Sequence, residues 1–470
     1  MDLFAPLKKL ASLFYQNSGY RNVPANEIPR QAMNLLVRHP LARKILYLTS
    51  LELDIEGSHY HGMLNTLSNH IIGPCPIMVG QTAVPEVNSN IEDKWMEFCN
   101  DNSIGTEIRL ARRAAARSGI CILIPYKKRS GNDVKLGLRV VPSEKLANPP
   151  GGTIEDRIFE GIEYDENWEP IKIYLDTGEE YDIDDIIMWW KKKDELRLAG
   201  IPECSSAFCV LPSVRRYLDS IIRSAEFRAA IPLAVTLDPL IWGKDSVQAN
   251  NINLPKGKFP FEPGTIPTLP PGTKLEGIPY SITSQETSEN LRLMIGSSAR
   301  SINMPVNLAT GDSSLYNMAS SQVDLGPWKE NLILERTDFM PVISKIVKLW
   351  LEGGSLVPDY FSPATKQLIR KKQLSYSMSF KSPFKHPDPQ KVSNSLFTDL
   401  ISGATTLTQY HTQEGVNPRR LIEREAQTLG KTYEELVDIY LVNRSPSVLQ
   451  IIRNLEVQDP QESSDDVKKQ

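Results

Sequence analysis

The feature that most constrains this chain is a proline-rich stretch between two predicted helices. Nine of the 34 prolines fall between Pro232 and Thr283, and proline removes a backbone donor and fixes φ. Neither a helix nor a central strand can run through such a stretch. Apolar spacing predicts one helix before it, at 211–230, and another after it, at 284–301. We therefore expect an extended insertion held out by two helices, a pair that buries little surface alone and needs neighbours.

The rest of the chain mixes helical and strand-like patterns without a repeating βαβ order, which indicates an α+β fold. Before the insertion, the spacing of apolar residues predicts helices and then short strands, at 56–72, 91–98, 107–117, 120–124 and 137–190. After it, a long apolar helix is predicted at 317–351, and Pro327 and Pro341 should kink or interrupt that helix. A strand-like return at 375–384 and small helices from 387 onward follow.

Composition excludes several classes of protein. The chain has 470 residues with 53 Lys and Arg against 57 Asp and Glu, a formal net charge of −4, which argues against a polybasic DNA binder. Contact with DNA without tight binding stays possible. Five cysteines without a CxxC pair indicate reduced thiols. No apolar run approaches the ~18 residues of a membrane span, so a soluble intracellular or assembled protein without membrane association is expected.

The search for catalytic motifs gives no active site. Gly430-Lys431-Thr432 lacks the first glycine of a phosphate loop, since position 425 is glutamate, and is interpreted as a helix C-cap. The histidines lack an accompanying cluster of metal ligands, so they are interpreted as structural: His59, His61 and His70. A metal-dependent nuclease would need clustered carboxylates. The nearest cluster is interpreted as a solvated turn: Asp182, Asp184 and Asp185. No enzyme activity, cofactor or metal is expected.

Two groups of residues have alternative interpretations. Four arginines stripe one helix, and a solvated or subunit-facing stripe is favoured over a phosphate-binding face: Arg109, Arg112, Arg113 and Arg117. Trp189 and Trp190 precede three lysines at 191–193. That arrangement could stack on nucleic acid, but one tryptophan in the core and one at an interface is the simpler interpretation.

One segment carries a family resemblance. Residues 291–322, LRLMIGSSARSINMPVNLATGDSSLYNMASSQ, resemble lambda-type bacteriophage portal proteins, with an apolar helix, an Asp-x-Ser loop and an Asn-x-x-Ser-Ser motif. The matching residues are Asp312, Ser313, Ser314, Asn317, Ser320 and Ser321. Met318 replaces the usual tyrosine, and Gln322 replaces the usual arginine. Further segments match in the same order over roughly residues 60–440.

The resemblance implies a portal-like subunit that assembles into a ring. It divides the chain into an N-terminal wing (1–204), first stem helix (205–231), clip (232–283), second stem helix (284–303), tunnel loop (304–318), wing/tunnel helix and return strand (319–386), helical crown (387–456) and disordered tail (457–470).

The resemblance also implies the function. The ring, expected to be a dodecamer, would form the channel at one capsid vertex through which the terminase packages double-stranded DNA and through which DNA is later ejected. Its partners would be DNA bound without sequence specificity, the large terminase subunit, head-completion or adaptor and tail proteins, and a major capsid or scaffold protein. The expected location is the virion, after assembly in the host cytoplasm. A capsid or tail structural protein without a DNA channel is the alternative.

Candidate site residues follow from the same template. The DNA-facing tunnel loop would comprise Ala309, Thr310, Gly311, Asp312, Ser313 and Ser314, followed by the motif residues Asn317, Ser320 and Ser321. The stem residues would be Arg215, Arg216, Arg223, Glu226 and Arg228. The terminase- or adaptor-facing clip residues would be Trp242, Lys244, Asp245, Lys256 and Lys258. The segment 305–318 contains no Lys or Arg, which suits sliding of DNA rather than tight binding.

Overall fold

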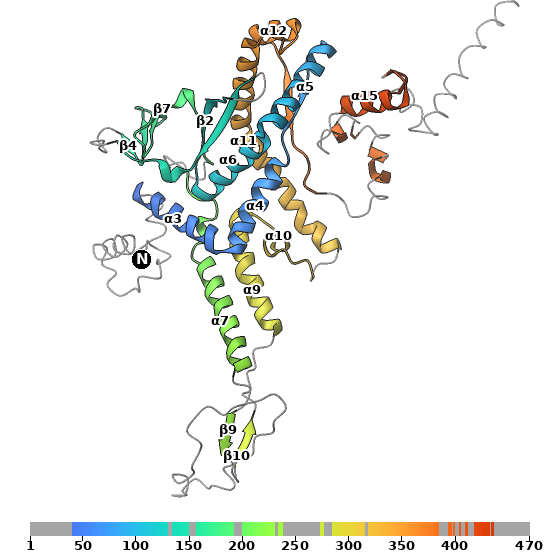
Figure 1. The fold of residues 1–470 in the computed structure, drawn as a ribbon. Coiled ribbons are helices and arrows are strands. Elements are labelled where there is room, and N and C mark those ends of the chain that lie inside the picture. Colours follow the sequence, from blue (N-terminus) through green and yellow to red (C-terminus); the bar gives the residue numbers. More distant parts are fainter. Residues whose placement is uncertain are drawn as a thin grey trace, which may run out of the picture.

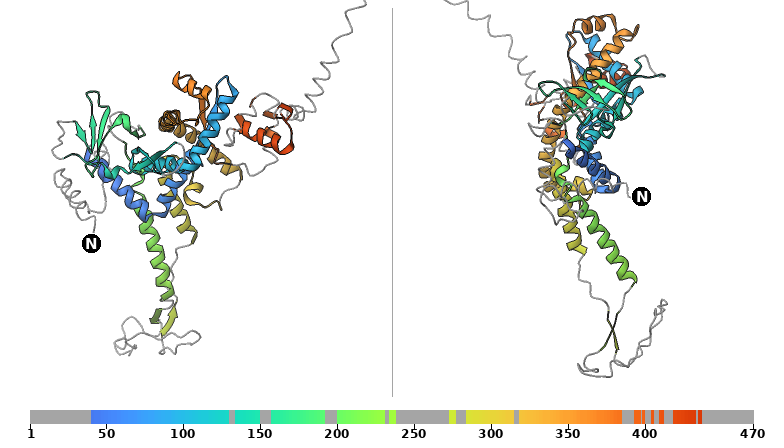
Figure 2. Two further views of the ribbon diagram at one scale, coloured as in Figure 1. Left: turned by 45° about the horizontal axis from the view of Figure 1, so that its top comes forward. Right: turned by 90° about the vertical axis from the view of Figure 1, so that its left-hand side faces the viewer.

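The computed structural model describes residues 40–129, 134–149, 157–191, 200–230, 234–237, 273–276, 284–314 and 318–384, and shorter pieces between 393 and 436. A body of helices and antiparallel sheets lies at one end, and two helices project from it side by side (Figure 1). Both further views show the same projection (Figure 2). The molecule is therefore a mixed helix-and-sheet protein, as the sequence predicts.

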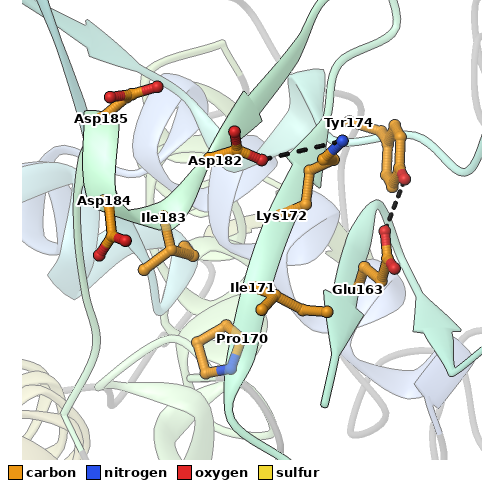
Figure 3. Close-up of a pocket in the computed structure, with 9 residues that line it drawn as sticks. All are labelled: Glu163, Pro170, Ile171, Lys172, Tyr174, Asp182, Ile183, Asp184 and Asp185. Carbon is orange, nitrogen blue, oxygen red and sulfur yellow. Dashed lines mark hydrogen bonds and ion pairs between the residues drawn. The ribbon is translucent and has the colours of Figure 1, made fainter.

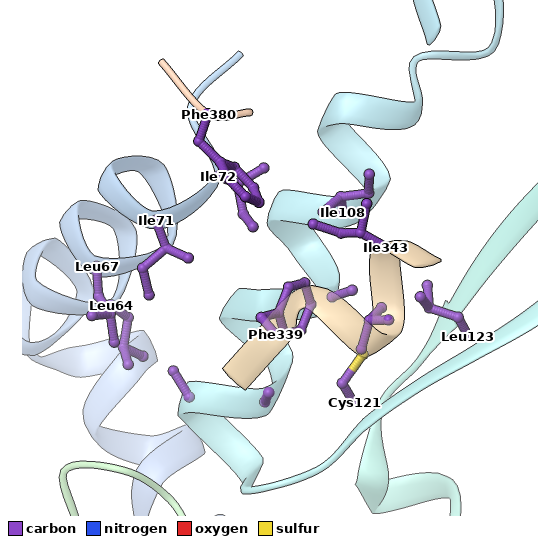
Figure 4. Close-up of a cluster of buried hydrophobic side chains, with 14 of the residues drawn as sticks. Leu64, Leu67, Ile71, Ile72, Ile108, Cys121, Leu123, Phe339, Ile343 and Phe380 are labelled. Carbon is purple, nitrogen blue, oxygen red and sulfur yellow. The ribbon is translucent and has the colours of Figure 1, made fainter. Parts of the chain in front are cut away.

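Five helices form the main core of the body, which is shown in part in Figure 4. They are α3 (Pro40–Glu56), α4 (Ser58–Ile72), α5 (Pro85–Asn102), α6 (Ile104–Ser118) and α11 (Met318–Leu356). The apolar residues whose spacing predicts the helix at 56–72 are buried, since Met63, Leu67 and Ile71 all lie in the core. Gly119 ends α6 with a φ of 87°, as a C-cap glycine does. The sequence did not predict α3.

Two antiparallel sheets cover one side of the helices. In the first, β2 (Cys121–Lys127) lies between β3 (Leu136–Val141) and β8 (Ile187–Trp189). The second has the order β4 (Ile158–Phe159), β5 (Ile162–Tyr164), β6 (Pro170–Tyr174) and β7 (Glu180–Asp182). Alternate residues of β2 point to different cores: Cys121 and Leu123 to the helices, Ile122 and Ile124 to a second cluster. The strand-rich pattern predicted for 137–190 is confirmed.

A two-stranded sheet joins the N-terminal helices of the body to a segment about 300 residues later in the chain. β1 (Ile77–Gly80) pairs antiparallel with β11 (Tyr376–Ser379), with Ile77 opposite Ser379. Nearby, α12 (Pro363–Arg370) follows an aromatic cluster in which Trp350 lies edge-on to Trp95 at 5.2 Å and to Phe361 at 5.2 Å. The strand-like return predicted near 376 is confirmed.

The projecting pair consists of α7 (Leu211–Ala230) and α9 (Ser284–Ala299). Pro212 lies in the first turn of α7, where its missing N–H has no helical acceptor to lose. Beyond the pair, β9 (Ala234–Leu237) and β10 (Thr273–Glu276) form a short antiparallel ribbon in which Leu237 faces Thr273. The remaining residues of the predicted clip lie outside the described residues.

Between α9 and α11 the chain makes a compact connection. A turn of 3-10 helix, Arg300–Ile302, leads to the short helix α10 (Val306–Thr310), which packs against α9 and α4. Helix α11 then runs through both Pro327 and Pro341, so of the predicted kink or interruption there is no interruption. Figure 1 shows the axis of α11 changing direction along its length, as prolines inside a helix cause.

Only small parts of the predicted crown are described. The longest is α15 (Pro418–Leu429), ended by Gly430 at φ 64°, which confirms the C-cap interpretation of Gly430-Lys431-Thr432. The tail at 457–470 lies outside the described residues. Among the described helices, none has the combination of length and apolar sequence that crossing a bilayer requires.

Candidate functional site

The projecting helices are anchored only at their base. Leu211 and Val214 at the start of α7, and Ile295 and Ala299 at the end of α9, are buried in the main core. Farther out, side chains are exposed on most faces of both helices, including Ile222 at 55% and Leu293 at 71%. A single subunit therefore leaves most of this pair in water.

The predicted stem residues occupy the exposed part of α7. Arg215, Arg216, Arg223 and Glu226 are all exposed, and the side chain of Arg228 lies outside the described residues. Arg215 forms an ion pair with Glu56 at the end of α3, which ties the base of the pair to the body. Arg216 donates to the hydroxyl of Ser213 one turn earlier.

The predicted tunnel loop divides into a short helix and an exposed turn. Ala309 and Thr310 belong to α10, and Ala309 is buried against the core, so the expectation that both lie in an open loop is wrong. The physical reason is that the sequence from Val306 supplies one helical turn with an apolar face for α4 and α9. Gly311 ends that helix at φ 71°, a backbone conformation that favours glycine.

The exposed turn is held by Asp312. Its carboxylate accepts a hydrogen bond of 2.9 Å from the backbone N–H of Ser314, and its own N–H donates to Thr310 Oγ1 at 3.2 Å. The hydrogen bond from Ser314 lowers the pKa of the Asp312 carboxyl, which keeps it ionised at neutral pH. Ser313 and Ser314 are also exposed.

The segment that contains this turn is negatively charged, and the cation that acts on the Asp312 carboxylate, Arg292, belongs to α9. From Ser301 to Trp328 the sequence contains two aspartates, Asp312 and Asp324, and neither lysine nor arginine. Of the motif residues after the turn, Ser320 is exposed and Ser321 is half-buried at the start of α11, while Asn317 lies outside the described residues. A DNA duplex that passes this segment would meet no lysine or arginine belonging to the segment itself.

The five predicted clip residues have no described structure. Trp242, Lys244, Asp245, Lys256 and Lys258 all lie outside the described residues, so their assignment stays a prediction.

The arginine stripe of α6 binds within the subunit. Arg112 is fully buried, and its guanidinium donates to Glu203 Oε1 at 2.6 Å and to Glu335 Oε2 at 2.8 Å. Arg113 pairs with Asp54 at 2.6 Å and Arg117 with Glu144 at 2.8 Å. The interpretation as a solvated or subunit-facing stripe is therefore wrong for Arg112, because burying its charge requires carboxylates on both sides.

The two tryptophans also pack within the subunit. Trp189 lies edge-on to Phe339 at 5.0 Å and donates from Nε1 to the carbonyl of Asp338, whereas Trp190 packs against the second cluster. They form no stacking surface of the kind that single-stranded nucleic acid uses.

The aspartates of the alternative nuclease site border an open hollow of about 710 Å³ beside β6 (Figure 3). Lys172 approaches Asp182 at 3.8 Å, and Tyr174 donates to Glu163 at 2.6 Å, which raises the pKa of Tyr174 to about 12. Within the described part of the chain, no three His, Cys, Asp or Glu side chains are placed to hold a metal ion. His61 instead pairs with Asp54 at 2.9 Å.

Comparison of sequences decides the family. The sequence model of the family described as "Phage portal protein, lambda family" matches residues 49–331, more than half of the chain. The chain belongs to the lambda family of phage portal proteins. This portal protein is therefore a structural protein and not an enzyme. No curated protein matches it.

Similar chains occur in solved structures of a gene transfer agent particle and of a phage portal protein. The neck of a native gene transfer agent particle computed with C12 symmetry aligns with 13% identity over 87% of this chain and 99% of that chain, with a TM-score of 0.42. A crystal structure of an HK97-family phage portal protein from Corynebacterium diphtheriae has 12% identity, covers 62% of this chain and 84% of that chain, and has a TM-score of 0.27. Since these TM-scores lie below 0.5, the family assignment rests on the sequence match.

Proposed function

We propose that this portal protein forms a closed ring at one vertex of a phage capsid, and that double-stranded DNA enters and leaves the particle through the ring's channel. The observation that carries the proposal is the projecting pair α7–α9, which exposes most of its surface in one subunit. Identical subunits related by rotation would cover that surface and close into a ring. On the family template the ring is a dodecamer located in the virion.

In this proposal the channel passes the exposed turn at residues 311–314. A channel must let DNA move, and each phosphate that a protein neutralises adds affinity and salt dependence. The ionised Asp312 and the absence of Lys and Arg from 301–328 suit a surface that repels phosphate weakly and lets the duplex slide.

The outer end of the projection would contact the other machines of the particle. The clip, at 232–283, is proposed to bind the large terminase subunit during packaging and the adaptor or tail proteins afterwards. Capsid or scaffold protein would contact the body. The β9–β10 ribbon lies at the far end of α7 and α9, where a docking partner could reach it.

The experiment that tests the ring is electron microscopy of the purified protein, with mass photometry on the same sample. We expect particles of about twelve subunits with a central pore wide enough for a duplex. A ring without such a pore would favour the alternative, a capsid or tail protein without a channel. Protein that remains monomeric or dimeric would contradict the proposal.

A substitution in the turn tests the channel. We expect the double substitution Asp312→Lys and Ser313→Lys to slow packaging or trap DNA, because two cations would bind phosphates of the passing duplex. The measurement is the rate of DNA translocation into proheads at several salt concentrations. The control Asp312→Asn with Ser313→Asn removes the negative charge without adding a positive one. Equal rates for wild type and the lysine variant would contradict a channel role for this turn.

A further inference from the structure

The end of the body opposite the projecting pair carries three adjacent cations. Helix α12 lies at that end, and α7 and α9 leave the body at the other (Figure 1 and Figure 2). Arg370 is the last residue of α12, and Lys371 and Lys372 follow it. All three side chains are exposed, and we call them the α12 cluster. Around them, residues 360–384 contain five Lys and Arg but no Asp or Glu, although the whole chain has a net charge of −4.

The α12 cluster is not neutralised within the subunit. In the part of the chain that the structure describes, no carboxylate forms an ion pair with any of the three cations. Carboxylates of the helices that pack against α12 pair elsewhere, as Glu97 does with Lys94 at 2.8 Å and Glu352 with Lys348 at 3.9 Å. One cation at a helix C-terminus stabilises the helix, but three adjacent cations also repel one another. The fold alone therefore gives little reason for the cluster.

The backbone keeps the three charges together at one helix end. The N–H groups of Lys371 and Lys372 donate to the carbonyls of Gln367 and Ile369, at 3.1 and 3.0 Å. Lys366, one turn earlier, donates from Nζ to the carbonyl of Val357 at 2.8 Å, so it binds within the subunit and is not part of the cluster. The cluster is thus a compact positive surface on an ordered helix.

The polyanion that this end of the molecule would meet is double-stranded DNA. This step rests on the proposed function, because a pair whose outer end faces the terminase outside the capsid leaves α12 facing the DNA stored inside. Exposed lysine and arginine bind DNA phosphates without reading the base sequence. The segment 301–328 contains neither. The chain therefore places cations at the proposed inner face and none in the segment along which the duplex is proposed to slide.

We infer that Arg370, Lys371 and Lys372 form a phosphate-binding surface for double-stranded DNA on the inner face of the ring. Rotation about the ring axis repeats the α12 cluster once per subunit, so the surface is a circle of cations. Each cluster neutralises about three phosphates, and the contact weakens steeply as salt rises. Such a surface holds stored DNA beside the channel without adding affinity inside it.

Binding of a closed DNA circle tests the inference. A covalently closed plasmid has no end that could enter the channel, so its binding reports the outside of the ring. The test variant combines Arg370→Gln, Lys371→Gln and Lys372→Gln. At about 100 mM salt we expect at least about tenfold weaker binding than for wild type, and a salt dependence of log Kd that is shallower by about two or more. The measurement is the electrophoretic mobility shift of the plasmid over a salt series.

A matched control removes three exposed cations from the region of the first sheet: Lys127→Gln, Arg139→Gln and Lys145→Gln. It has the same net charge as the test variant and should bind the plasmid as wild type does. Circular dichroism should show wild-type helix content in both variants, because every substituted side chain is exposed.

The outcomes separate this inference from the proposed ring. If wild-type rings do not bind the plasmid, or if both variants bind it equally well, only the DNA-binding role of the α12 cluster is wrong. Rings that bind the plasmid less tightly per subunit than free subunits would also contradict that role, since a neighbouring subunit would then cover the cluster. A protein that forms no ring contradicts the proposed function, and the comparison of the two variants still tests the cluster.

Discussion

At the scale of single residues, Arg112 links four distant parts of the body. Its guanidinium contacts Glu203 and Glu335, and Lys191 also pairs with Glu335. Removing the cation would leave two buried carboxylates without their main partner. We expect Arg112→Met to lower the free energy of unfolding by about 3–5 kcal/mol, measured by urea denaturation with tryptophan fluorescence. The control Arg139→Met removes an exposed pair with Glu179 and should cost at most about 1 kcal/mol. Equal losses would contradict the structural role of Arg112.

His70 makes stability depend on pH. Burial lowers the pKa of the His70 imidazole, and the nearby Arg336 lowers it further. Trp328 Nε1 donates to His70 Nδ1 at 3.3 Å, a bond that requires the neutral ring nitrogen as acceptor. As pH falls through the ordinary histidine pKa of about 6.5, the unfolded chain takes up this proton before the folded protein does. The free energy of unfolding should therefore fall between pH 7 and pH 5.

The variant His70→Gln isolates this effect, because glutamine keeps an acceptor for Trp328 but does not titrate. Urea unfolding at several pH values should show a shallower loss in the variant than in wild type. An identical pH dependence in both proteins would assign the loss to other groups.

At the scale of elements, the end of α6 crosses the segment that leads to α7. Gly119 has a φ of 87°, and a Cβ there would lie 2.5 Å from the carbonyl carbon of Gly200. Gly178 has a similar φ of 82° but no neighbouring atom within 4 Å of a Cβ. We expect Gly178→Ala to cost about 1–2 kcal/mol, the strain of the left-handed conformation. Gly119→Ala carries the same strain plus a backbone collision, so it should be clearly more destabilising in thermal unfolding. Equal costs would show that the crossing can move apart.

The elements also show which parts of the structure the sequence predicts. Helices α4, α6, α7 and α9 are predictable because their apolar residues recur with helical spacing and Gly119 marks an end. The ion pairs of Arg112 cannot be predicted from the sequence, because Glu203 and Glu335 lie 91 and 223 residues away from it along the chain. Helix α10 is too short, at five residues, for periodicity to distinguish it from a loop. The family resemblance places Ala309 and Thr310 in the tunnel loop, and the spacing of apolar residues gives no signal that would correct it.

At the scale of the whole molecule, the projection is the part that assembly should protect. In a free subunit the outer turns of α7 and α9 have few buried contacts, so local opening there costs little. Among the sites on the described helices, trypsin should cut free subunits first after Arg216 or Arg223, and rings should be cut at these two sites at least about tenfold more slowly. Mass spectrometry of early fragments measures both rates. Equal cleavage in free subunits and rings would contradict burial of α7 by a neighbouring subunit.

The strand pair β1–β11 affects how the chain folds while the ribosome is still synthesising it. Ile77 cannot pair with Ser379 until about 300 further residues have left the ribosome, which at about 5–20 residues per second takes on the order of 15–60 s. During that interval α5 and α6 can already cover parts of β1 and α4, but the surfaces that meet β11 and α11 stay uncovered while the projecting pair and its insertion are still being made. A nascent body of this kind is a natural client for chaperones. The concentration of closed subunits, and so the onset of assembly, is set by completion of the chain near its C-terminal quarter.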